Sequence, residues 1–357
     1  MSDNPRPLYA TLARRVGYSV AIMLICIVPS AVLYLITHES AATWATGAGI
    51  AGVTALWVGS VEMAVLTSFV MALLTPVAIV AGSSSIGGAA LMAMMCLTVG
   101  RMSRFGLHRA TLLVPVFMAW MLIDPPFWGP QHTVDRTDNV YLAWMAVIFL
   151  VGALVPVAVL PFALKKVHLP TPMQHSRRES LPYTVTITVL ASVSTFWVLE
   201  HPKQVAGAWL IATILVLSQV GDVGTVRRTV GRVLGTILGT LVVAVIVARV
   251  ESLALIYVIG VVFAVAALTA KFSPHYWIYM ALITPTVVCL NASSSTEVKN
   301  LGEQRMADTL VGAALVLIAA AMTIGYSRWA SHRGEGAAPE SPVMLGQPVA
   351  KSPVTAG

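Results

Sequence analysis

Arg-Phe-Gly-Leu-His at Arg104–His108 and Lys-Phe-Ser-Pro-His at Lys271–His275 are near copies, and this pair decides the predicted fold. Each string ends a long apolar stretch and precedes a short apolar stretch with a proline in it, Pro115 in one case and Pro285 in the other. This pattern predicts a parallel internal duplication of a membrane unit, an architecture that is common among transporters.

The composition agrees with a membrane protein. Apolar residues make up 57% of the chain and charged residues 10%, and the mean hydropathy is +0.82. A soluble domain would carry about 25% charged residues. Only helices or a closed barrel can span a bilayer, and long apolar runs without a period of two favour helices. We therefore predict an all-α polytopic membrane protein.

Twelve membrane spans are expected, as two parallel six-helix repeats. In the first half they are Val16–Thr37, Ala42–Val58, Val61–Val80, Ile86–Val99, Ala110–Ile123 and Tyr141–Leu164. In the second half they are Tyr183–Leu199, Gln204–Val220, Val230–Ala248, Leu253–Ala270, Tyr276–Leu290 and Met306–Tyr326. The fourth, fifth and eleventh spans are short, so an arrangement of ten spans stays open.

The domain boundaries follow from this repeat. Residues 1–164 form the first repeat and residues 181–330 the second. A basic linker with two prolines, Lys165–Ser180, joins them on the cytoplasmic side and is too short to fold as a domain. The segment 331–357, rich in Gly, Ala, Pro and Ser, is predicted to be a disordered cytoplasmic tail.

Basic residues predict the orientation, because cytoplasmic loops carry an excess of Lys and Arg. With the N-terminus inside, all but five of the 22 lysines and arginines fall on the cytoplasmic side. The five on the other side are Arg136, Lys203, Arg249, Lys299 and Arg305. We therefore expect a multi-pass protein of a bacterial inner (cytoplasmic) membrane with both termini in the cytoplasm. No basic patch with interleaved aromatic residues is present, so nucleic-acid binding is not expected.

The sequence gives no sign of an enzyme or of a cofactor. No phosphate-binding loop or Gly-x-Ser-x-Gly motif occurs, and no two histidines pair within one span. The three cysteines, Cys26, Cys96 and Cys289, all fall within predicted spans at spacings that suit neither a metal site nor a disulfide framework. We expect them to be packing residues.

Three stretches of the second half resemble the fusaric acid resistance proteins, which include the aromatic acid exporters. They are TVRRTVGRVLGTILGT at Thr225–Thr240, YWIYMALITPTVVCL at Tyr276–Leu290 and RMADTLVGAALVLIA at Arg305–Ala319. The resemblance implies an inner-membrane exporter of small organic, often aromatic, acids or related toxic compounds. It also implies a periplasmic membrane-fusion adaptor as a partner. This chain lacks the large cytoplasmic insert that Gram-negative members of the family usually carry between the halves.

Short or Pro-interrupted helices at matching places in two halves of a transporter often mark its binding site. Pro115 and Pro285 occupy such places, and each can free a carbonyl one turn earlier. Thr284 and Thr286 could hydrogen-bond that carbonyl or a substrate. Asp124, which ends the fifth predicted span, completes this group of substrate-path candidates.

Arg232 is a further substrate-path candidate, at the cytoplasmic entrance of the ninth predicted span. It could concentrate organic anions there. It could equally be a simple topology signal. The same span carries Gly231, Gly235 and Gly239, whose spacing predicts close packing against a neighbouring helix and less often a substrate path.

Four titratable residues are candidates for proton coupling: Glu62, His108, His275 and Asp308. Acidic residues close to the membrane are costly and often functional, and histidines titrate near neutral pH. Asp308 lies near the start of the last predicted span, where the helix dipole would also favour it. It lies three residues after Arg305, a spacing that allows an ion pair.

The resulting hypothesis is an exporter, driven by inward proton flow, that binds an organic anion between its halves. A passive organic-anion channel and a non-transporting membrane assembly partner are the alternatives. Its expected partners are the organic anion, the lipid bilayer, the adaptor and further copies of the chain as a homo-oligomer. The two longest outside loops, Asp124–Asn139 and Asn291–Arg305, are the expected docking sites for the adaptor.

Overall fold

The computed structural model describes residues 8–129, 134–163, 174–201, 207–218, 223–250, 252–271, 275–291 and 295–332. These residues form helices and the turns between them, with no β-strand among them. Residues 165–173 of the predicted linker and 333–357 of the predicted tail lie outside the described residues. Residues 1–320 form one compact unit, and residues 321–357 form a second.

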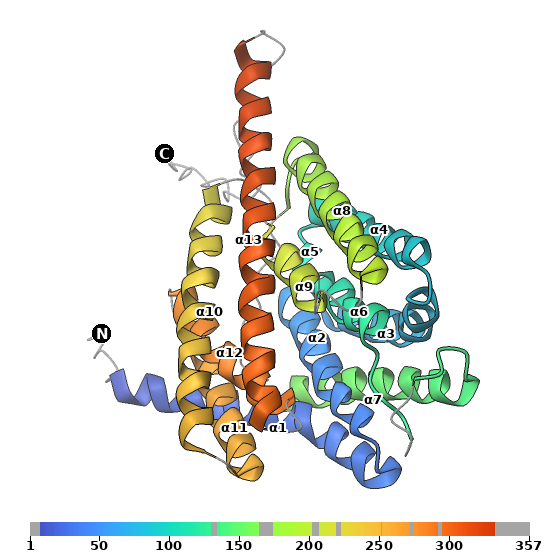
Figure 1. Cartoon of the computed structure of the whole chain (residues 1–357), viewed down its shortest axis with the longest axis vertical. Coiled ribbons are helices and arrows are strands. Elements are labelled where there is room, and N and C mark those ends of the chain that lie inside the picture. Colours follow the sequence, from blue (N-terminus) through green and yellow to red (C-terminus); the bar gives the residue numbers. More distant parts are fainter. Residues whose placement is uncertain are drawn as a thin grey trace, which may run out of the picture. The chain divides into compact units, whose positions relative to one another are not determined.

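The helices follow the predicted order (Figure 1). In the first half they are α1 (Leu8–Thr37), η1 (Ser40–Thr43), α2 (Trp44–Val58), α3 (Val61–Ala81), α4 (Ser85–Met102), η2 (Ser103–Phe105), α5 (His108–Thr111), α6 (Leu113–Ile123) and α7 (Asn139–Ala163). In the second half they are α8 (Arg177–Glu200), α9 (Ala208–Leu217), α10 (Val223–Arg249), α11 (Leu253–Ala270), α12 (Tyr276–Asn291) and α13 (Ser295–His332).

Eight of the described helical segments are long and apolar enough to cross a membrane. Shorter apolar helices cover His108–Ile123, Ala208–Leu217, Ala254–Ala270 and Tyr276–Leu290. The prediction of a helical multi-pass membrane protein is therefore confirmed. The arrangement of twelve spans in two repeats stays a prediction.

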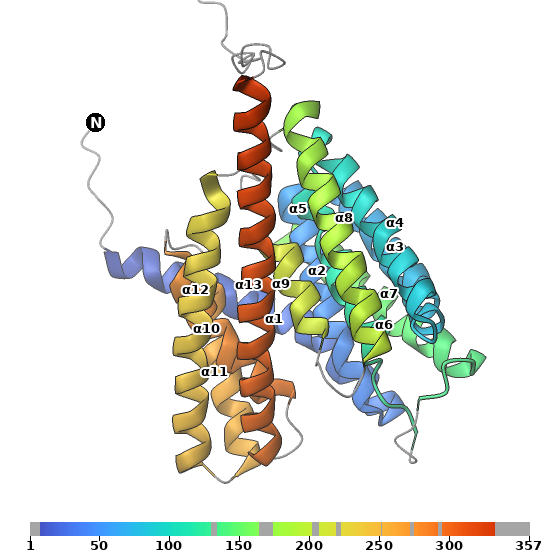
Figure 2. The same cartoon turned by 45° about the horizontal axis from the view of Figure 1, so that its top comes forward.

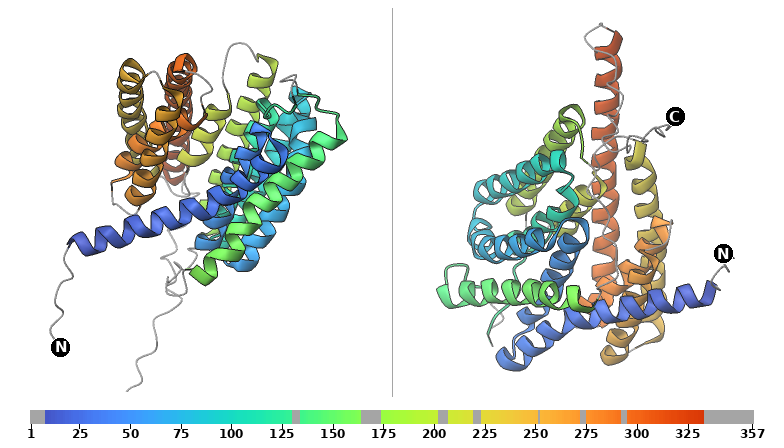
Figure 3. Two further views of the ribbon diagram at one scale, coloured as in Figure 1. Left: turned by 90° about the horizontal axis from the view of Figure 1, so that it is seen from below. Right: turned by 180° about the vertical axis from the view of Figure 1, so that it is seen from behind.

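Within the first unit, the first helix of each half packs against the fourth span of the other half. Helix α8 lies along α4, which Figure 2 shows. Helix α1 crosses to the helices of the second half (Figure 3) and contacts α11 there. At this contact the Thr269 hydroxyl donates a 3.2 Å hydrogen bond to Ser19 Oγ. These two contacts tie the two halves of the chain together.

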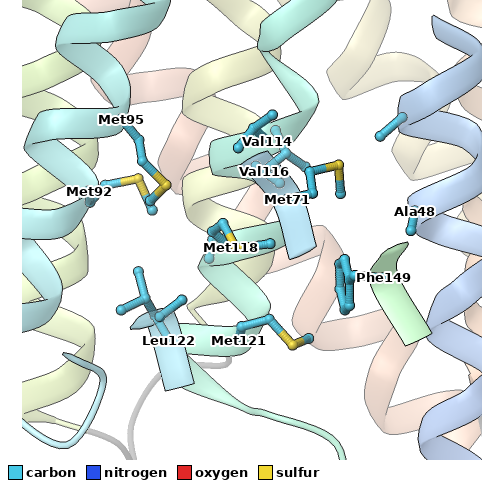
Figure 4. Close-up of a cluster of buried hydrophobic side chains, with 14 of the residues drawn as sticks. Ala48, Met71, Met92, Met95, Val114, Val116, Met118, Met121, Leu122 and Phe149 are labelled. Atoms are coloured by element: carbon cyan, nitrogen blue, oxygen red, sulfur yellow. The ribbon is translucent and has the colours of Figure 1, made fainter. Parts of the chain in front are cut away.

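The core of the first half is rich in methionine. Helices α2, α3, α6 and α7 pack together and enclose Met71, Met118, Met121 and Met145, with Phe149 among them. Figure 4 shows several of these flexible thioether side chains converging from different helices. Methionine fills irregular spaces well, so this core can adapt its packing.

The glycine-rich face of α10 packs against α12. A Cβ atom on Gly235 would lie 2.5 Å from Met280 Cβ and 2.6 Å from the Trp277 carbonyl oxygen. A Cβ atom on Gly239 would lie 2.6 Å from Thr284 Cβ. The glycines therefore allow close helix packing, which is the more favoured of their two sequence-based interpretations.

Candidate substrate site

Few ionisable side chains are buried in the described part of the chain, and three of them face the same helix. Among the described residues, the buried Asp, Glu, His, Lys and Arg side chains are His108, Arg232, Arg305 and Asp308. Arg232 comes from α10, and Arg305 and Asp308 come from α13; all three face α9. Ionisable groups within a membrane are expensive, so their convergence indicates a functional site.

Arg305 has free hydrogen-bonding capacity. It is 3% exposed, and its guanidinium carbon lies 4.1 Å from the ring centroid of Trp209. Its Nε and Nη1 atoms are buried without a hydrogen-bond partner. No ion pair joins it to Asp308, although the two residues are spaced to allow one. The cation–π contact therefore holds the guanidinium while two donors stay available to a ligand oxygen.

Arg232 supplies a second positive charge beside Arg305. Its Nη2 donates to Thr213 Oγ1 at 3.2 Å and its Nη1 contacts Met280 Sδ at 3.6 Å, while its Nε has no partner. A thioether is a weak acceptor, so neither contact neutralises the charge. The two guanidinium groups are close enough to repel each other. An anion between them would relieve that repulsion.

Asp308 caps the start of α9. Its carboxylate accepts a hydrogen bond from the Leu210 backbone N–H, one of the donors that a helix N-terminus leaves unsatisfied. Gly207, at φ +46°, makes the turn that begins this short helix within the protein. Asp308 Oδ2 is buried without a partner. Since α13 begins at Ser295, Asp308 lies in its interior, and the expectation that the dipole of its own helix stabilises it is wrong.

Aromatic rings extend from this site into the first half. Trp209 on α9 meets Trp120 on α6 edge to face, with ring centroids 4.6 Å apart and planes at 84°. Trp120 in turn lies 6.1 Å from Trp44 and 6.4 Å from Phe117, measured between centroids. Both halves therefore shape the site, one with charges and the other with aromatic surface.

A row of arginines leads to the site from the beginning of α10. Arg228, one turn before Arg232, lies over the ring of Tyr276 at 5.7 Å. Arg109 on α5 is near enough to repel the charge of Arg228. Arg109, Arg228, Arg232 and Arg305 thus form a stepwise positive path, which would attract an anion inward.

His108 lies in a separate polar cluster. Its ring centroid is 5.3 Å from that of His175 and 5.8 Å from that of Tyr183. His108 Nδ1, Ser180 Oγ and the Tyr183 hydroxyl are all buried without a partner. His175 in turn approaches Glu179, with Nδ1 and Oε2 3.7 Å apart. This cluster joins α5 to the start of α8 and contains titratable groups next to one another.

We call the group of Trp209, Arg232, Arg305 and Asp308 the arginine site. The other sequence-predicted substrate-path residues lie outside it. Thr284 Oγ1 donates to the Met280 carbonyl and Thr286 Oγ1 to the Leu282 carbonyl, both at 2.9 Å, so both hydroxyls bond within their own helix. Pro285 packs in α12 against the glycine face of α10.

Two more of these candidates belong to α6. Pro115 is buried in its first turn, where a helix needs no N–H. Asp124 is exposed at its C-terminal end.

Two of the proton-coupling candidates are exposed. Glu62 lies in the first turn of α3, which the Ser60 side chain caps by accepting from the Met63 N–H. His275 directly precedes α12 and is also exposed. His108 and Asp308, in contrast, are buried.

The sequence-based reasoning missed Arg305, Trp209 and Trp120 as site residues. Arg305 was expected in an outside loop because the last span was thought to begin at Met306. The signal that could have revealed it is the polar start of α13, which is helical from Ser295. No spacing rule in the sequence pairs Trp209 with Trp120, because they come from different halves.

Comparison with known proteins supports the resemblance. Residues 183–319 match the model of the family described as fusaric acid resistance protein-like. This part of the chain belongs to that family. The matched segment runs from α8 into α13 and includes Trp209, Arg232, Arg305 and Asp308. No curated protein and no solved structure matched the chain.

The buried side chains of the fusaric acid resistance protein-like segment suit an organic anion. Within the described residues, no three His, Cys, Asp or Glu side chains lie close enough together to hold a metal ion. Guanidinium donors beside indole rings suit a planar carboxylate, which can bond to a guanidinium through both its oxygens.

Proposed function

We propose that this protein exports small organic anions, aromatic carboxylates in particular, across a bacterial inner membrane. The observation that carries the proposal is Arg305, buried with two unpartnered donors against the ring of Trp209. A carboxylate would occupy those donors, and its ring would pack among Trp209 and Trp120.

The anion is proposed to follow the row of arginines from the cytoplasm into the protein. With both termini in the cytoplasm, α10 begins at the cytoplasmic side. Arg109 and Arg228 then form the entrance for the anion, and Arg305 binds it deeper in the protein. The contact between α6 and α9 joins the halves beside the site. Rocking at this contact would expose the anion to the other side, where an adaptor would receive it.

We assign proton coupling to the His108 cluster. His108, His175 and Tyr183 bring titratable groups together next to the predicted cytoplasmic linker, whereas Glu62 is exposed. Burial lowers the pKa of His108 to about 4, so a proton bound there is readily released. Inward proton flow would then drive export, and a passive anion channel would lack this coupling.

The test uses full-length protein in liposomes with benzoate as the probe. Arg305→Gln removes the charge and should weaken benzoate affinity about 10- to 150-fold, the range for a lost hydrogen bond between charged partners. Arg249→Gln, at the exposed end of α10, is the matched control and should leave affinity unchanged. Equal benzoate affinity in both variants would refute the proposed site.

Energy coupling needs its own measurement. An imposed proton gradient should drive benzoate against its concentration gradient in the native protein. Benzoate flux that only dissipates its own gradient, whatever the proton gradient, would instead identify a passive channel.

A further inference from the structure

The arginine site contains one acidic side chain, and its charge affects which anions can bind there. Asp308 is 5% exposed, as buried as Arg232 at 6% and Arg305 at 3%. It forms no ion pair with either arginine, and no other Asp or Glu is buried among the described residues. We propose that Asp308 makes the arginine site selective for singly charged anions.

Burial opposes the ionised form of Asp308, whereas two features of the fold favour it. Its carboxylate accepts the Leu210 N–H at the start of α9, where the helix dipole is positive. The guanidinium groups of Arg232 and Arg305 contact the same helix, α9, as the Asp308 carboxylate does, and positive charge on that side favours a carboxylate anion. From α12 the phenols of Tyr279 and Tyr276 lie near Arg305, and they add no carboxylate to the site.

The selectivity follows from charge balance in a medium of low polarity. Two arginines and one aspartate leave the empty site with one net positive charge. A singly charged carboxylate brings the total to zero, whereas a doubly charged one leaves an excess negative charge. Because an uncompensated charge is expensive to bury, the singly charged ligand binds better. This inference rests on the proposed function, because it presumes that the ligand binds at Arg305.

Asp308→Asn tests the proposal while retaining a side-chain oxygen for the Leu210 N–H. Affinities of the purified full-length protein for benzoate and for phthalate, which is doubly charged at neutral pH, are measured by titration calorimetry. The variant site has two net positive charges and should shift the phthalate-to-benzoate affinity ratio at least about 10-fold toward phthalate, since a unit charge across about 10 Å at an effective dielectric constant near 20 gives a factor of this size.

A second substitution separates charge from local structure. Asp308→Asn combined with Arg232→Gln restores one net positive charge, so the preference for benzoate should return. Arg232→Gln alone leaves the α9 cap intact and should shift preference from benzoate toward neutral benzamide. Glu303→Gln removes an acidic group from the exposed face of α13 and should leave all ratios unchanged.

The outcomes distinguish this inference from the proposed function. Benzoate binding that depends on Arg305 but shows the same ratios in every variant would overturn the role of Asp308 alone. Benzoate binding that is absent from the native protein, or unaffected by Arg305→Gln, would overturn the proposed function and this inference with it. A ratio that shifts in Asp308→Asn and returns in the double variant supports charge selection.

Discussion

Replacing Gly235 by alanine should loosen the contact between α10 and α12. The new Cβ would lie 2.5 Å from Met280 Cβ, 2.6 Å from the Trp277 carbonyl oxygen and 2.9 Å from the Ala281 nitrogen. These atoms belong to or adjoin the backbone of α12, so the helices must separate. Overpacking of this kind costs about 1–3 kcal/mol.

Gly231→Ala is the matched control, one turn earlier on the same face. Its Cβ would meet Tyr276 Cδ1 at 3.4 Å, which is an ordinary van der Waals contact. Both variants gain the same helix propensity, about 0.5–1 kcal/mol, so their difference in unfolding free energy isolates the overpacking. Gly235→Ala should unfold at lower temperature than Gly231→Ala in the same detergent. Equal unfolding midpoints would refute the close packing of these two helices.

Three further results are expected. Arg136→Gln should lower the unfolding temperature, because the Arg136 guanidinium donates to the Ile79, Leu122 and Ile123 carbonyls and so joins the ends of α3 and α6. Burial lowers the pKa of this guanidinium. An unchanged unfolding midpoint would contradict this role. Thr284→Val should leave benzoate affinity within a factor of about 3, because the Thr284 hydroxyl is hydrogen-bonded within its own helix. A larger loss of affinity in calorimetry would indicate that benzoate binds at α12. His108→Gln should abolish proton-driven benzoate export in liposomes and Glu62→Gln should not; the opposite result would move proton coupling to α3.

The helices could be predicted because the bilayer imposes their length and polarity. Apolar runs that end at basic clusters, such as the run before Arg104, mark helix ends directly in the sequence. The same rule failed at α13. Its first residues are polar, so hydropathy placed the helix start near Met306, although the backbone is already helical from Ser295. Hydropathy reports which residues lipid tolerates and does not report where helical hydrogen bonding begins.

The site was predicted only in part, for a related reason. Arg232 and Asp308 could be singled out because charge near an apolar run is visible in one sequence. Arg305 is equally charged, but its meaning depends on Trp209, a residue of another helix that no local pattern links to it. The paired prolines drew attention to Thr284, whose hydroxyl turned out to bond within its own helix.

The two halves differ in buried charge, and this difference follows from where a buried charge can be tolerated. Both halves supply helices to one compact unit, and α6 of the first half touches α9 of the second. Yet the buried arginines and aspartate all come from the second half, and the first half offers Trp120 and a methionine-rich core. In the proposed transport cycle, a contact that repacks is better served by methionine and aromatic surface than by charges, which would lose their solvation at every step. We therefore infer that the second half holds the anion and the first half moves against it.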